Sequence, residues 1–154
     1  MSKPASSLSL YAPHGARIGL GLIYFVFGLN GFLHFLPTPP PSGAAGTFLG
    51  GLAAAGYFFP LLKATEVLGG LALLTNRAVP LALVVLAPIT VQILAYHTLL
   101  AGGAGLSIAM AALHLGIAWA YRDAFYGLFA FSRQPLRAGE RQTDPGLAKR
   151  AVSV

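Results

Sequence analysis

The chain has 154 residues, of which 56% are hydrophobic and 9% are charged, and it contains no cysteine. Soluble domains carry about 25% charged residues, so the composition argues against a soluble globule, and the lack of cysteine excludes disulfides and thiol redox chemistry. The formal net charge of +6 raises nucleic acid as a possible partner, a question that the positions of the basic residues decide.

Four apolar segments are long enough to cross a bilayer as helices, because a hydrocarbon core of about 30 Å takes about 20 residues. They cover residues 17–36, 57–75, 79–100 and 106–125. These runs are too long for the strands of a membrane β-barrel and do not alternate as such strands do. A cleaved signal peptide is disfavoured because the first run is long and carries Asn30 and His34. The sequence therefore predicts an all-α bundle of four transmembrane helices.

We also predict the structure of the three segments that lie outside these helices. Residues 44–55 follow a proline-rich stretch and are too short to span and too apolar for water. We expect a short helix there, lying in the outer interface or dipping into the bundle. Residues 1–16 are expected to form a cytoplasmic N-terminal segment. Residues 127–154 are polar and basic, and are expected to form a disordered cytoplasmic tail.

The basic residues predict the orientation. Every lysine and arginine except Lys63 lies on the side that carries both termini, and the loops 37–56 and 102–105 contain none. By the positive-inside rule, both termini are cytoplasmic. The positive charge is therefore a topology signal, and no basic patch interleaved with aromatics indicates nucleic acid. The expected location is a bacterial inner (plasma) membrane.

Two charged residues lie inside a predicted span. Lys63 and Glu66 are three positions apart, so they share one face of their helix. Charges at membrane depth cost about 2.5–3.5 kcal/mol each on insertion scales and usually face the bundle interior. The pair is either a neutral structural pair or a functional site that handles protons, and both interpretations stay open.

Other polar residues are predicted to lie in the same outer half of the membrane, from the helical rise of about 1.5 Å per residue. We expect a ligand-binding layer formed by Asn30, His34, Gln92, Tyr96, His97 and His114. Taken singly, His34 and His97 are more typical of interfacial anchors than of ligands. Asn30 and Gln92 are more typical of hydrogen bonds between helices. Haem and copper are disfavoured because the two histidines at matching depth lie near the surface. No spacing of histidines or carboxylates indicates another metal.

Small residues predict close helix packing. Ala112, Gly116 and Ala120 form a stripe on the fourth span, and His114 lies on the opposite side of that helix. Either the stripe or His114 faces the bundle centre, and the sequence does not decide between them. Glycines on the first two spans offer further close contacts, at Gly28, Gly31, Gly69 and Gly70.

Two short elements carry a family resemblance that extends over about residues 17–125. One is Lys-x-x-Glu-x-x-Gly-Gly, beginning at Lys63, and the other is Asn-Arg-x-x-Pro-Leu, beginning at Asn76. Together with Asn30 and His34 at the end of the first span and with His97, they resemble the DoxX-like membrane proteins. That resemblance implies a four-helix bundle.

The functions implied by the resemblance differ. Some DoxX-like proteins resemble subunits of quinone-linked oxidoreductases such as thiosulfate:quinone oxidoreductase, and one eukaryotic relative is an assembly chaperone for nicotinic receptors. The membrane region of the vitamin K-dependent carboxylase is similar more distantly, and by analogy it implies a proton-handling role for Lys63.

Three hypotheses follow. The first is a quinone-binding accessory oxidoreductase subunit that needs a partner with a redox centre. The second is a non-enzymatic assembly chaperone or adaptor with a client membrane protein. The third is a small solute or proton transporter, for which four helices would require a homo-oligomer.

Overall fold

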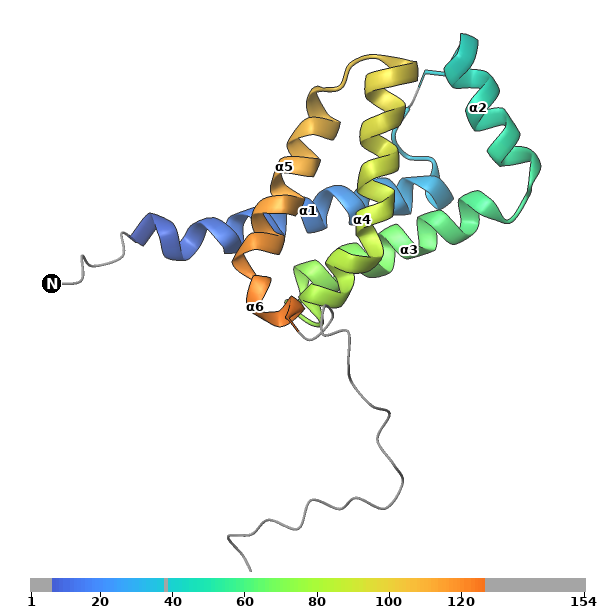
Figure 1. Ribbon diagram of the computed structural model, residues 1–154. Helices are drawn as coiled ribbons and strands as arrows, with labels where there is room; N and C mark the ends of the chain where they lie inside the picture. Colours follow the sequence, from blue (N-terminus) through green and yellow to red (C-terminus); the bar gives the residue numbers. More distant parts are fainter. Residues whose placement is uncertain (1–6, 38, 127–154) are drawn as a thin grey trace, which may run out of the picture.

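The computed structural model describes residues 7–37 and 39–126, and every regular element within them is a helix (Figure 1). In chain order these are α1 (Ser7–Leu33), α2 (Gly43–Ala54), α3 (Phe58–Leu74), α4 (Val79–Tyr96), the short π-helix η1 (His97–Ala101), α5 (Gly105–Ala120) and α6 (Arg122–Phe125). The predicted all-helical class is confirmed.

The first helix differs from its predicted bounds at both ends. It begins at Ser7 instead of residue 17, and it runs through Pro13 near its start. Much of the expected N-terminal segment 1–16 is thus helical, while residues 127–154 of the expected tail lie outside the described residues. The helix ends at Leu33 because His34 has a positive φ of 51° and Pro37 follows soon after, and neither conformation continues a right-handed helix.

Four helices pack into a closed ring. Along the ring α1 contacts α3, α3 contacts α4, α4 contacts α5, and α5 contacts α1. In Figure 1 the α1–α3 pair crosses the α4–α5 pair, which brings the middles of all four helices together. The enclosed core is apolar, and it includes the fully buried Leu20, Leu73, Leu86 and Ile117.

The α1–α3 contact is the closest in the bundle, and glycines make it possible. A Cβ atom on Gly70 would lie 2.6 Å from the backbone nitrogen of Phe25, and one on Gly28 would lie 2.9 Å from the backbone nitrogen of Val67. Neither distance is sterically possible, so a side chain at either glycine would force the two helices apart. The close contacts predicted from the glycines therefore occur.

The helix α2 lies where a short helix over residues 44–55 is predicted. It contacts α3 and η1, and its axis turns by 94° into α3 across a short break. The apolar run that continues from residue 43 to residue 74 is therefore sharply bent.

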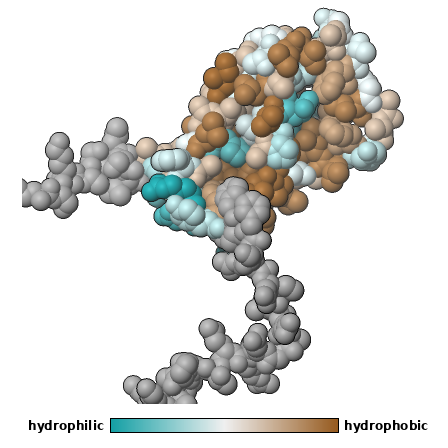
Figure 2. All heavy atoms as spheres, viewed as in Figure 1, coloured by the Kyte–Doolittle hydropathy of each residue, from teal (hydrophilic) through white to brown (hydrophobic). Residues whose placement is uncertain are grey.

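Length and hydropathy support a membrane protein. Within the described residues two stretches, Ala12–Leu33 and Val79–Ala101, are long and apolar enough to span a bilayer, and the bent α2–α3 pair would make a third. Large apolar side chains such as Leu68 and Leu115 are about two-thirds exposed or more. Figure 2 shows a predominantly hydrophobic face, with a hydrophilic patch at the end of the bundle that carries α6.

Candidate functional site

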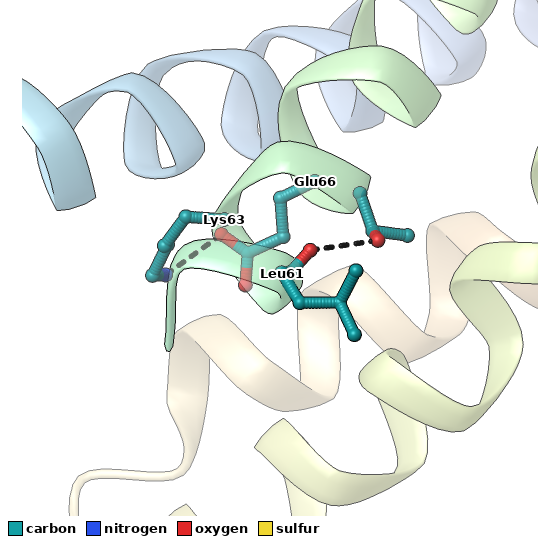
Figure 3. Close-up of polar contacts among 4 residues, drawn as sticks. Leu61, Lys63 and Glu66 are labelled. Carbon is teal, nitrogen blue, oxygen red and sulfur yellow. Dashed lines mark hydrogen bonds and ion pairs between the residues drawn. The ribbon is translucent and has the colours of Figure 1, made fainter. Parts of the chain in front are cut away.

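Lys63 and Glu66 form an ion pair on α3. The Lys63 Nζ atom donates a hydrogen bond of 2.7 Å to Oε2 of Glu66. Figure 3 shows the two side chains turned toward each other, with α1 on one side of α3 and with α4 and α5 on the other. The Glu66 side chain is only 3% exposed, whereas that of Lys63 is 23% exposed. The carboxylate is thus inside the bundle and the ammonium group is at its edge.

The ion pair leaves bonding capacity unused. A lysine ammonium group has three N–H donors, and within the described residues Lys63 uses one of them, on Glu66. The stem of Lys63 crosses α1 at Gly31, where an added Cβ atom would lie 2.6 Å from Cδ of Lys63. A side chain at position 31 would therefore displace Lys63. The geometry presents free donors at the outer surface of a buried pair, where a ligand carbonyl could accept them.

A second polar cluster lies next to this pair and joins three helices. Tyr24 of α1 forms a hydrogen bond of 2.6 Å with the hydroxyl of Thr90 on α4, and that hydroxyl lies 2.8 Å from Nδ1 of His114 on α5. All three residues are at least 94% buried. The carboxyl group of Glu66 interacts electrostatically with the Tyr24 phenol. Each helix of the ring thus contributes at least one buried polar group.

The Thr90 hydroxyl joins the members of this cluster. It also lies 3.0 Å from the carbonyl oxygen of Leu86. A threonine hydroxyl has one proton and two lone pairs, so it can bond to Tyr24 and to Nδ1 of His114 at the same time. This arrangement satisfies the three side chains within the bundle, and it locks α1, α4 and α5 to one another.

The orientation of α5 was left open by the sequence. His114 is buried, whereas Ala112, Gly116 and Ala120 are exposed, and an added Cβ atom on Gly116 would meet nothing within 4 Å. His114 therefore faces the bundle centre, and the small-residue stripe faces outward.

Three of the predicted ligand-binding residues form no hydrogen bond with the ion pair within the described residues. Asn30 holds the chain after α1, because its Oδ1 accepts a hydrogen bond of 2.6 Å from the backbone N–H of Leu36. His34 is exposed beyond the end of α1, and Gln92 is exposed on α4. The structure thus gives Asn30 a role in the backbone turn and directs His34 and Gln92 away from the bundle interior.

Tyr96 and His97 form a separate aromatic group at the end of α4. Their rings meet edge to face at 5.1 Å, and Phe48 of α2 lies 6.1 Å from Tyr96 between ring centroids. The Nδ1 atom of His97 lies 2.9 Å from the carbonyl oxygen of Ile93. A carbonyl accepts only, so Nδ1 carries the proton and Nε2 is the acceptor. These residues join α2 to the α4–η1 junction.

Sequence reasoning missed Tyr24 and Thr90. The available signal was a tyrosine near the middle of a predicted span, because tyrosines in membrane helices normally occupy the interfaces. Thr90 gave a weaker signal, since threonine often bonds to the carbonyl four residues earlier in its own helix. His114, which lies in the predicted layer, is the member of the cluster that the sequence identified.

Arg17 was read as a topology signal alone, and the structure gives it a packing role. Its guanidinium group is buried and donates from Nη1 to the carbonyl oxygens of Leu73 and Leu74 at the C-terminal end of α3. These carbonyls belong to the last turn of α3, at the negative end of the helix dipole. Arg17 therefore caps α3 from the neighbouring helix.

Metal-ligating residues are dispersed. Within residues 7–37 and 39–126, no three histidine, aspartate or glutamate side chains come together. The candidate site is thus the Lys63–Glu66 pair with the Tyr24–Thr90–His114 cluster beside it.

Comparisons with known proteins do not assign a family to the chain. No protein-family model matches the chain, and no curated protein or solved structure is significantly similar to it.

Proposed function

We propose that this chain is a four-span protein of the bacterial inner membrane, resembling DoxX-like subunits, that binds a quinone or a similar lipid-soluble carbonyl compound at Lys63 and Glu66. The observation that carries the proposal is the ion pair itself. Charged groups at membrane depth are costly, and an apolar pair would pack at this position more cheaply. Lys63 keeps unused donors at the bundle edge, which a quinone carbonyl arriving from the lipid could accept.

The packing supports four crossings. Consecutive helices are joined by short connections, and α4 contacts both α3 and α5. The stretch formed by α4 and η1 is long enough to span, and in the proposal the helices beside it, including the 16-residue α5, cross as well. At 17 residues, α3 is about 25 Å long, and thinning of the bilayer or tilting of its neighbours accommodates the difference.

The orientation has matching support. Tyr121 donates a hydrogen bond of 3.2 Å to Oδ1 of Asn76, which ties the end of α5 to the α3–α4 turn. Arg17, bound at the end of α3, and Arg77, in that turn, lie at the same end of the bundle. Basic residues favour the cytoplasmic side, so this end and both termini are cytoplasmic in the proposal.

Quinone binding is tested with the full chain in phosphatidylcholine nanodiscs, titrated with a radiolabelled short-chain quinone. The Lys63→Met and Glu66→Gln variants remove the two charges with little change in shape. We expect each to weaken binding by about tenfold, the loss of one charge-assisted hydrogen bond. The matched control is Gln92→Leu, which removes an exposed polar group from α4 and should leave binding unchanged.

Two results would overturn the proposal. One is wild-type uptake of the quinone that equals its partition into empty nanodiscs. The other is equal binding by the wild type, Lys63→Met and Glu66→Gln. Recovery of a stoichiometric membrane-protein client together with the first result would favour the assembly-factor function.

An electron-transfer partner belongs to the proposal. The chain has no cysteine for thiol redox chemistry, so a partner subunit with a redox centre would exchange electrons with the quinone. Lys63 and Glu66 would then supply hydrogen bonds and move protons, which makes this chain an accessory subunit.

A further inference from the structure

A positively charged end of the bundle, away from the Lys63–Glu66 pair, lacks a matching set of acidic residues. Three arginines of the described residues lie there, Arg17, Arg77 and Arg122, against the single carboxylate of Asp123. The Asp123 side chain is 82% exposed, and its Oδ1 atom comes no nearer than 3.9 Å to Nε of Arg122. The ion pair is therefore weak and solvated. The end therefore keeps a net positive charge.

Arg17 is the buried arginine of this group, and it adds to the positive charge from inside the bundle. Arg17 is 6% exposed, and its Nε atom has no hydrogen-bond partner in the described part of the chain. Its guanidinium is balanced there only by backbone carbonyls of α3. A buried cation without an acidic partner is costly, and an anion near this end of α3 would lower that cost.

An apolar groove opens at the same end, between α4 and α6. It has a volume of about 160 Å³ and is lined by Pro80, Leu81, Val84, Ala124 and Phe125. Each lining segment carries an arginine shortly before it, Arg77 before α4 and Arg122 at the start of α6. The groove thus has an apolar floor and cationic flanks.

The aromatic residues beside Arg122 indicate the depth of this end. Arg122 lies over the ring of Trp119 at 5.3 Å, and Trp119 is 72% exposed. Exposed tryptophans of membrane proteins gather at the level of the lipid headgroups. The hydrophilic patch at the α6 end in Figure 2 agrees with this position. The arginines are therefore at the height of lipid phosphates, and the groove extends toward the acyl chains.

We propose that this end of the bundle binds an anionic phospholipid, with its phosphate between Arg77 and Arg122 and one acyl chain in the groove along Leu81 and Val84. A zwitterionic lipid fits less well, because its choline or ethanolamine group would bring a positive charge to the same place. The site is independent of quinone binding at Lys63.

The test uses the full chain in phosphatidylcholine nanodiscs with and without phosphatidylglycerol, and native mass spectrometry counts the phosphatidylglycerol retained on release. We expect Arg77→Gln and Arg122→Gln each to lower retention by about fivefold. Ala124→Leu should also lower retention, since it fills the groove without changing charge. The matched control is Arg141→Gln, a basic residue outside the described part of the chain, for which retention should stay at the wild-type level.

Further arms separate the remaining possibilities. An equal loss for Arg141→Gln would mean diffuse attraction by all basic residues and would overturn the proposal. Displacement of the lipid by inorganic phosphate, with no effect of Ala124→Leu, would indicate a phosphate site instead of a lipid site. Circular dichroism of each variant shows whether it keeps its helices. If Arg77→Gln loses them, Ala124→Leu and Arg122→Gln decide the outcome.

Discussion

Thr90 is the residue on which the buried polar cluster depends. Its hydroxyl forms hydrogen bonds with Tyr24 and His114, so the Thr90→Val substitution leaves two buried polar groups without their partner. Valine has nearly the shape of threonine, so the packing is otherwise kept. We expect the free energy of unfolding to fall by about 1–2 kcal/mol, the usual range for hydrogen bonds between membrane helices. Denaturant titration in detergent micelles measures the change.

A matched control exists on α3. Thr65 also donates to the carbonyl four residues earlier, at 2.9 Å from Leu61, but it holds no side chain of another helix. The Thr65→Val variant should therefore change the free energy of unfolding by less than about 0.5 kcal/mol. Equal effects of Thr65→Val and Thr90→Val would show that the cluster around Thr90 contributes nothing to stability.

The cluster also shows what a sequence can predict about a site. Lys63 and Glu66 were identified because charges are rare in membrane helices, and their spacing already requires a shared face. Tyr24 and Thr90 are 66 positions apart, so no local pattern pairs them and only the folded arrangement of α1 and α4 brings them together. The six-residue layer was inferred from depth alone, and depth leaves out the direction in which Gln92 and His34 face.

At the scale of the elements, the close contact between α1 and α3 at their glycines leads to a prediction about stability. In Gly70→Ala the new Cβ atom would meet the backbone nitrogen of Phe25 at 2.6 Å and the carbonyl oxygen of Gly21 at 2.9 Å. Backbone atoms cannot rotate away as a side chain can, so the helices must separate. We expect a loss of about 1–3 kcal/mol in the free energy of unfolding, measured in the same denaturant titration.

Gly116→Ala is the corresponding control, because an added Cβ atom there has open space. Alanine is the better helix former, by up to about 1 kcal/mol, so this variant should be as stable as the wild type or more stable. A loss at Gly116 similar to that at Gly70 would mean that the α5 stripe is packed against something outside the chain.

The parts of the helices that are determined by hydrophobicity were predicted well. The helix ends and bends, which are determined by backbone geometry, were predicted less well. The core of each helix follows its apolar run. The early start of α1 at Ser7 could not be read from hydropathy, because its first turns are polar or mixed. The break between α2 and α3 falls at Gly56, which has a positive φ of 70°. The 94° angle across it and the π-helical end of α4 were not predicted.

At the scale of the whole molecule, composition and helix length support a membrane protein, and an experiment is needed to count the crossings. The native chain has no cysteine, so single cysteines can report the topology without a background. Ser42→Cys lies just before α2, Ala101→Cys is at the last residue of η1, and Thr75→Cys directly follows α3. All three native residues are exposed, so a cysteine at each should react wherever water reaches it.

For four crossings, a membrane-impermeant maleimide added to intact cells should label Ser42→Cys and Ala101→Cys, because both then face outward. Thr75→Cys should be labelled only after the membrane is permeabilised. If the bent α2–α3 pair instead dips into the membrane and returns to the side it came from, Ser42→Cys and Thr75→Cys would react from the same side. That pattern would leave the arginine-rich end and the loop before α2 on one side. The opposite reactivity of these two positions, joined by the bend between α2 and α3, therefore decides whether the ring of helices is a four-span bundle.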